Sequence, residues 1–291
     1  MEKSFKAVFS PQLFDPFPGV QDGPSFEESW RSNRPWVLSN LAHAAYLDRD
    51  KIEDLMAGLG VATTLCYDRS GAQAFLAVWP DKAVLSFRGS QPRERDRSQE
   101  RDRQSERDGL GEPRGVIEGF REFLGLDLDA KIATFLGNDV LADLKFRKTQ
   151  FDDVPDVKVH RGFLQELDKL WVDDVLPDLE RHAAGTSTWV TGHSLGAAMA
   201  TLAGMRHAFA EVVTFGEPRV GTNIDLAFKS GAHLRYRNGA DPVTMVPPEL
   251  PFGFDHHGEL IRITDPGGAT DFRYDHSIVY YSENLSGRSR L

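Results

Sequence analysis

The sequence has 291 residues, of which 40% are hydrophobic and 27% are charged, a composition typical of a soluble globular protein. Its 34 Lys and Arg residues are outnumbered by 44 Asp and Glu residues, and the net charge of -10 argues against nucleic-acid binding. The single cysteine, Cys66, excludes an intramolecular disulfide and a cysteine-based zinc cluster. No apolar stretch approaches the roughly 20 residues of a membrane-spanning helix.

We expect one domain that covers residues 1–291, because α/β enzymes often use roughly 200 to 300 residues as a single unit, although this length also fits two domains. The first residues lack the apolar run and the cleavage site of a secretory signal. A cytoplasmic protein would show this pattern. A chain whose signal has been removed, or one exported by a non-classical route, would show it too, so the localisation stays open.

The first half of the chain predicts an arm, two helices and a strand meander. Residues 1–25 are rich in proline and phenylalanine without any period and are expected to form an extended arm. Ser25 and Glu28 form a capping box that predicts a helix start, and a second helix is predicted from Asn33. Between residues 62 and 88, three β-rich runs separated by turn residues predict strands.

The second half alternates helical and strand patterns. Helices are predicted over residues 160–179 and 193–208 and after residue 274, and strands over 187–192, 211–216, 233–238 and 259–264. This order predicts an α/β fold with a mostly parallel or mixed central sheet and helices on both of its faces.

Residues 192–196 read Gly-His-Ser-Leu-Gly, the G-x-S-x-G pattern of a nucleophile elbow. An apolar strand pattern precedes it and a helix of small residues follows, which is the frame that the motif needs. Gly192 and Gly196 are expected to make room for the tight turn, and Ser194 is expected to stand at the helix N-terminus, where negative charge is favoured.

A serine nucleophile needs a base and an acid that orients it, in the chain order Ser, Asp or Glu, His. Asp241, just beyond a predicted strand, and His276, near the end of the chain, fit these positions best. The competing acids are Asp255, Asp265 and Asp271, and the competing bases are His256 and His257. The two adjacent histidines also fit a hydrogen-bonded pair beside the site, and they are too few for a metal.

The oxyanion of the tetrahedral intermediate needs two N–H donors. We expect one from Leu195, which follows the nucleophile, and another from Ser90, which ends the Phe-Arg-Gly-Ser sequence after a predicted strand.

Several sequence blocks resemble the class 3, fungal-type triacylglycerol lipases and follow that family's order. They are FRGS (87–90), ADL (142–144), VHRGFL (159–164), VTGHSLGAAMATL (190–202), TFGEPRVG (214–221), RNGADPVTMVPP (237–248), FGFDHHGELIRITD (252–265) and YDHSIVYY (274–281). The resemblance implies an α/β-hydrolase fold, a Ser194–Asp241–His276 triad, and an oxyanion hole of Ser90 and Leu195. The ending has one residue more between the histidine and the next tyrosine than the family's usual DHxxYF, which leaves the packing of Tyr280 and Tyr281 open.

In that family a helical lid between the FRGS and DL blocks covers the site in water and opens at a lipid surface. Here the interval, residues 91–138, is longer than the family's usual lid. Residues 93–108 hold six arginines and six acidic residues and predict a solvated strap. We expect residues 116–136 to form an enlarged lid, the alternative being a core helix displaced by an insertion.

The sequence therefore predicts a serine carboxylic-ester hydrolase, a lipase that cleaves acylglycerols through an acyl-enzyme. We expect it to need no metal or organic cofactor. Its partners would be a lipid or small ester substrate and, transiently, a lipid–water interface, with no nucleic acid and no transmembrane segment. The alternatives are a phospholipase A1 or galactolipase, an aryl-ester (feruloyl-type) esterase and, more remotely, a non-catalytic lipid-binding pseudoenzyme.

Overall fold

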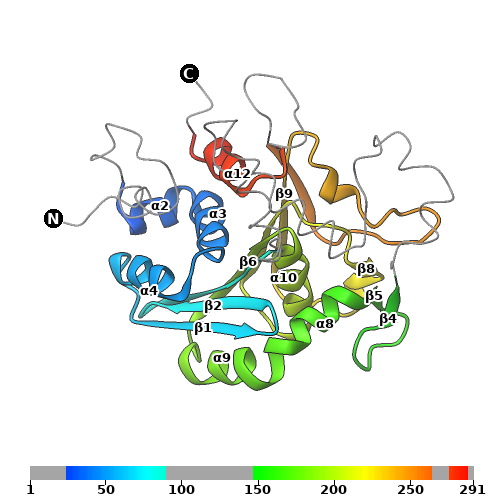
Figure 1. Cartoon of the computed structure of the whole chain (residues 1–291), viewed down its shortest axis with the longest axis horizontal. Coiled ribbons are helices and arrows are strands. Elements are labelled where there is room, and N and C mark those ends of the chain that lie inside the picture. The colour runs from blue at the N-terminus through cyan, green and yellow to red at the C-terminus, as the bar shows by residue number, and fades with distance from the viewer. Residues whose placement is uncertain (1–23, 90–146, 264–274, 288–291) are drawn as a thin grey trace, which may run out of the picture.

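The computed structural model describes residues 24–89, 147–263 and 275–287 (Figure 1). The expected N-terminal arm up to residue 23, the insertion at 91–138 with its strap and lid, and Ser90 lie outside the described residues. The interpretations of these segments stay predictions.

The helices and strands follow the order expected from the sequence. The helices are α2 (Phe26–Ser32), α3 (Arg34–Ala44), α4 (Arg49–Gly58), α8 (Arg161–Leu170), η2 (Trp171–Val175), α9 (Leu176–His182), α10 (Leu195–Arg206), η3 (Ile224–Leu226), η4 (Pro242–Met245) and α12 (Ile278–Leu285). The strands are β1 (Thr63–Arg69), β2 (Ala72–Val78), β3 (Lys82–Phe87), β4 (Lys148–Gln150), β5 (Lys158–His160), β6 (Ser187–His193), β7 (Glu211–Phe215), β8 (Gly221–Thr222), β9 (Ala232–Asn238) and β10 (Glu259–Ile263).

Seven strands form the central sheet in the order β1-β2-β3-β6-β7-β9-β10. The first three pair antiparallel, and the remaining four pairings, from β3–β6 to β9–β10, are parallel. The prediction of a mixed, mostly parallel sheet is therefore confirmed. Because the parallel strands point the same way, their carboxyl ends lie along one edge, where α/β folds gather their functional loops. A small antiparallel sheet, β4-β5-β8, lies beside it.

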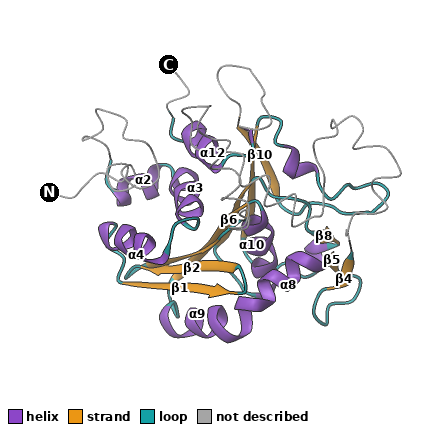
Figure 2. Cartoon of the chain, viewed as in Figure 1, coloured by secondary structure: helices purple, strands orange, loops and turns teal. Residues whose placement is uncertain are grey.

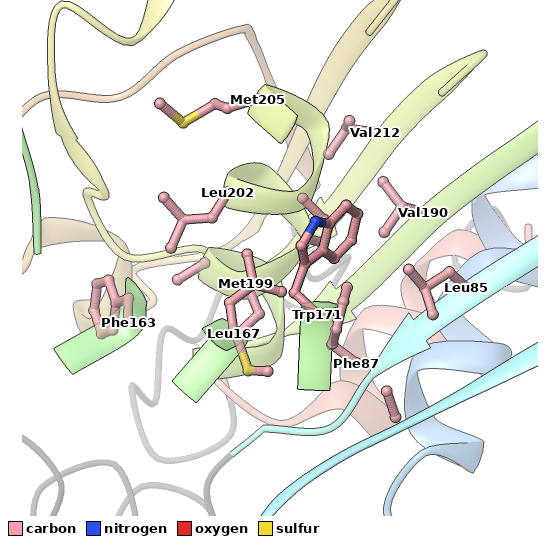
Figure 3. Close-up of a cluster of buried hydrophobic side chains, with 14 of the residues drawn as sticks. Leu85, Phe87, Phe163, Leu167, Trp171, Val190, Met199, Leu202, Met205 and Val212 are labelled. Atoms are coloured by element: carbon pink, nitrogen blue, oxygen red, sulfur yellow. The ribbon is translucent and has the colours of Figure 1, made fainter. Parts of the chain in front are cut away.

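Helices cover both faces of the central sheet (Figure 2). One buried cluster packs α8, η2, α9 and α10 against one face, and a second packs α2, α3, α4 and α12 against the other. In the first cluster, Leu167 and Trp171 lie against α10 and the strand residues Leu85 and Val190 (Figure 3). Within the described residues, no helix is long and apolar enough to cross a bilayer.

Local signals in the sequence set where the first helices begin. Ser25 and Glu28 form the predicted capping box, since the Ser25 hydroxyl accepts from the Glu28 N–H and the Glu28 carboxylate accepts from the Ser25 N–H. The side chain of Asn33 accepts from the Trp36 N–H and caps α3. Both predicted helix starts are therefore confirmed.

The core makes a stability prediction at Leu167. This side chain is fully buried between α8 and α10, so Leu167→Ala should lower the free energy of unfolding by about 2–5 kcal/mol. Val172, five residues later, is 65% exposed, and Val172→Ala should change it by less than about 0.5 kcal/mol. Urea unfolding followed by tryptophan fluorescence measures the free energy of unfolding of both variants. An equal loss of stability in the two variants would contradict this packing.

Candidate active site

Ser194 forms the sharp turn that joins β6 to α10. Its backbone has φ 61° and ψ −124°, a strained conformation for a residue with a side chain. The Ser194 N–H donates to the carbonyl of Phe215 at 3.0 Å, which ties the turn to the end of the neighbouring strand β7. The turn places Ser194 at the N-terminus of α10, where free N–H groups and the helix dipole favour negative charge.

Two glycines make the turn sterically possible. A Cβ on Gly192 would meet the backbone of Gly196, and a Cβ on Gly196 would meet the carbonyl of Phe87 on β3. The helix can therefore begin directly against the strand edge only because both positions lack a side chain.

The structure brings Asp241 and His276 to Ser194. The Nε2 atom of His276 lies 3.0 Å from the Ser194 hydroxyl, and its Nδ1 atom lies 2.9 Å from each carboxylate oxygen of Asp241. All three side chains are fully buried. Since an ionised carboxylate only accepts, Nδ1 donates to Asp241 and Nε2 is left to accept the serine proton.

Leu195 is the first residue of α10, so its backbone N–H belongs to the group that has no partner within the helix. Gly89, which follows β3, packs against the carbonyl of His193, and Ser90 comes next in the chain. The predicted second oxyanion donor, Ser90, lies outside the described residues.

The competing acids and bases make other contacts. The Nε2 of His256 donates to the carbonyl of Thr244 at 2.8 Å, and His257 bonds to His233 and Asp225. Asp255 accepts from the N–H of His256. The histidine pair thus fits the alternative of hydrogen-bonded loop residues. Asp265 and Asp271 lie outside the described residues. Within residues 24–89, 147–263 and 275–287, no group of three or more His, Cys, Asp or Glu side chains is suited to a metal ion.

Comparisons with known proteins agree with this geometry. Residues 133–250, which include Ser194 and Asp241, match the family described as lipase (class 3). This part of the chain is similar to the class 3 lipases. The chain is 33% identical over 139 residues to a lipase of Rhizomucor miehei. The matched region is 43% of this chain and 38% of that protein. The chain is 32% identical over 130 residues to a secreted mono- and diacylglycerol lipase of Fusarium solani, which covers 40% and 37% respectively. The chain thus spans less than half the length of these curated relatives.

Solved structures of class 3 lipase relatives have the same fold. Lipase II from Rhizopus niveus superimposes with a TM-score of 0.52 at 21% identity and covers 82% of both chains. A triacylglycerol lipase whose catalytic centre is described as a serine protease triad superimposes with a TM-score of 0.53, covering 80% of both chains. The predicted α/β fold, with a mixed and mostly parallel central sheet flanked by helices, is confirmed.

Sequence reasoning missed Tyr281 as a partner of Asp241. Its hydroxyl donates to Asp241 Oδ2 at 2.6 Å, and its side chain is fully buried on α12. Burial, together with the neighbouring carboxylate, raises the pKa of Tyr281 well above its usual value, so the phenol keeps its proton. Of the two tyrosines whose packing the sequence left open, Tyr281 thus contacts the acid.

Asp275 was also missed, although it directly precedes the base. Its carboxylate accepts from the N–H of Ala240 at 2.7 Å, and Gly239 (φ 45°) packs against the same carboxylate. The side chain of Asn238 donates to the carbonyl of Asp275 at 3.3 Å. These contacts join the loop that carries Asp241 to the segment that carries His276. No periodicity or spacing in the sequence pointed to this role.

Glu217 forms a second buried polar cluster just beyond β7. Its carboxylate lies 2.9 Å from Nε2 of His233, and Nδ1 of His233 lies 3.0 Å from Nδ1 of His257, whose Nε2 lies 3.2 Å from Asp225. Because a carboxylate only accepts, Nε2 of His233 donates to Glu217 and Nε2 of His257 donates to Asp225. The preceding residue, Gly216, packs against Asp241 and His276, so this cluster adjoins the triad.

Burial alone would raise the pKa of Glu217, but the charge and hydrogen bond of His233, with smaller contributions from Arg235 and His256, lower it to about 2. The ion pair therefore contributes stability above the ordinary glutamate range. That stability is lost as the pH falls from about 5 toward 2.

We expect Glu217→Gln to lower the free energy of unfolding at pH 7 by about 3 kcal/mol or more, because it removes the carboxylate from a buried pair and leaves His233 without that acceptor. Its unfolding free energy should also depend less on pH between about 5 and 2 than that of the wild type. Asp173→Asn, at an exposed ion pair with Arg69, is the control and should change stability by less than about 1 kcal/mol. Parallel acid profiles for wild type and Glu217→Gln would contradict the assignment.

Proposed function

We propose that the protein is a serine ester hydrolase that cleaves acylglycerols with Ser194 as nucleophile, His276 as base and Asp241 as acid. One observation carries the proposal, namely the continuous hydrogen-bonded chain from the Ser194 hydroxyl through both nitrogens of His276 to Asp241. The names of the relatives support the reaction class, because both curated relatives compared above are lipases.

The reaction proceeds in two acyl-transfer steps. His276 takes the proton of Ser194 as the hydroxyl oxygen attacks the ester carbonyl, and the Leu195 N–H stabilises the oxyanion, with Ser90 as the predicted second donor. His276 then gives the proton to the leaving alcohol. Water repeats the sequence on the acyl-enzyme and releases the acid. Asp241 holds the imidazole tautomer throughout and stabilises the imidazolium.

Apolar residues beside the acid support a lipid substrate. Met245 is 53% exposed and Leu250 is 83% exposed, and both follow Asp241 on the segment that continues from η4. The secreted mono- and diacylglycerol lipase of Fusarium solani supports acylglycerols as the substrate class.

Ser194→Ala should lower kcat for a soluble short-chain ester by about 10⁴-fold or more, because the variant retains only binding and oxyanion stabilisation. A fluorophosphonate should label the wild type and leave Ser194→Ala unlabelled. Ser29→Ala, at another buried serine on α2, is the matched control and should keep wild-type activity and labelling. Equal labelling of Ser194→Ala would overturn the assignment of the nucleophile.

The substrate class is tested with monoacyl-, diacyl- and triacylglycerols beside phosphatidylcholine, a galactolipid and an aryl ester. Acylglycerols should give the highest kcat/KM. A preference for the phospholipid, the galactolipid or the aryl ester would contradict the acylglycerol assignment and leave the serine hydrolase in place. Absence of both hydrolysis and labelling would contradict the proposal as a whole.

A further inference from the structure

His193 and the partly buried Tyr46 form a polar pair that the reaction scheme does not use. His193 precedes the nucleophile and is fully buried, and Tyr46 follows the end of α3. The Tyr46 hydroxyl lies 2.9 Å from Nδ1 of His193, and Nε2 of His193 lies 2.7 Å from the backbone carbonyl of His276. The pair thus links helix α3 to the main chain of the base.

The direction of each hydrogen bond follows from the groups present. A carbonyl oxygen only accepts, so Nε2 of His193 carries a proton and donates to His276. A neutral imidazole then accepts at Nδ1, and the Tyr46 hydroxyl must be the donor. The Gly89 backbone packs against the same phenol oxygen. No other arrangement of a neutral ring satisfies all of these contacts.

The surroundings keep both groups neutral. Burial, the neighbouring His276 and the nearby His43 lower the pKa of His193 well below its usual value, an effect that its hydrogen bond to His276 opposes only in part. Burial raises the pKa of Tyr46, although the Arg88 guanidinium and the Gly89 N–H act in the other direction. The donor and acceptor pattern is therefore constant over the pH range in which a serine hydrolase works.

These contacts meet three parts of the site. Gly89 follows β3 and precedes the predicted oxyanion donor, His193 ends β6 beside Ser194, and His276 is the base. The Gly89 backbone packs so closely on the Tyr46 hydroxyl and the His193 carbonyl that a Cβ there would overlap both. The rings of His193 and His276 also pack with their centroids 4.6 Å apart. A shift of His193 would thus move the main chain of the base.

We propose that Tyr46 and His193 are positioning residues, which hold the main chain of His276 and of Gly89 in the geometry that ester hydrolysis needs. The proposal rests on the proposed function, since it assigns no reaction of its own. In this arrangement His193 holds the backbone carbonyl of His276, whereas Asp241 holds its imidazole ring.

The first test is Tyr46→Phe, which removes one oxygen atom and keeps the ring. We expect kcat to fall about 10- to 100-fold with little change in KM, because Nδ1 of His193 loses its hydrogen-bond donor while the substrate contacts stay. The matched control is Tyr67→Phe. Tyr67 is a buried tyrosine whose hydroxyl bonds an acid, Asp178, but it lies on β1 at the far edge of the sheet. This control should keep wild-type kcat.

A second pair of variants separates positioning from packing. His193→Gln retains an amide donor that can reach the carbonyl of His276, and His193→Leu fills similar space without a donor. We expect His193→Gln to keep clearly more activity than His193→Leu at comparable melting temperatures. Equal activity of these two variants would count against the hydrogen bond to the base.

The proton on Nδ1 of His276 gives a readout that does not depend on turnover. In the wild type it should resonate far downfield in the proton NMR spectrum, because it is shared with Asp241, and in Tyr46→Phe it should shift or broaden. Tyr67→Phe should leave it unchanged. This signal tests positioning even if fluorophosphonate labelling of the wild type fails, an outcome that would contradict the proposed function alone.

The proposal is overturned if Tyr46→Phe retains kcat within twofold and leaves the His276 resonance in place. It is also overturned if Tyr46→Phe and Tyr67→Phe lose activity equally, since the effect would then be general destabilisation. A rise in KM at constant kcat would likewise contradict it, because that result would place Tyr46 in substrate binding.

Discussion

Ser194 is held at φ 61° between β6 and α10, and that strained backbone conformation persists because the structure around it permits no alternative. Strain of this kind costs roughly 1–3 kcal/mol and is found where the neighbouring packing over-determines the main chain. Here Gly192 packs on Gly196, Gly196 packs on the end of β3, and the Ser194 N–H is bonded to Phe215. The nucleophile is thus fixed by three strands at once.

The acid and the base are also held in place by buried hydrogen bonds. Asp241 accepts from His276, from the Val243 N–H at 2.9 Å and from Tyr281, so its carboxylate is compensated from several directions. Asp275 fixes the loop in front of it. A buried carboxylate is stable only when it is paired and hydrogen-bonded, and the residues that meet this need also fix the orientation of the imidazole.

The features that could be predicted from the sequence are those with a local physical signature. Short β-rich runs separated by turn residues predicted β1 to β3, capping residues predicted the starts of α2 and α3, and the Gly-x-Ser-x-Gly pattern predicted a turn between strand and helix. The choice of Asp241 and His276 followed from chain order, and the structure places both beside Ser194.

The supporting residues could not be predicted because their roles are tertiary. Tyr281 lies 40 residues from Asp241, and Tyr46 lies 147 residues from His193, so no periodicity relates the members of either pair. Nothing in the sequence near Tyr281 relates it to Asp241. The two residues meet because α12 places the Tyr281 hydroxyl on the Asp241 carboxylate. Glu217 lies in a block that the family resemblance identified, but its histidine partners come from β9 and a later loop.

In the strand order, β7 lies between β6, which leads to the nucleophile, and β9, which leads to the acid. Adjacent strands are about 4.8 Å apart, so these two strands are separated by roughly 9–10 Å, a gap about the size of one imidazole with its two hydrogen bonds. Gly216 directly follows β7, and a side chain at this position would overlap both Asp241 and His276. The His276 ring therefore occupies the space that a side chain at position 216 would fill. Even the methyl group of an alanine there would displace the ring or the Asp241 carboxylate from the position that catalysis needs.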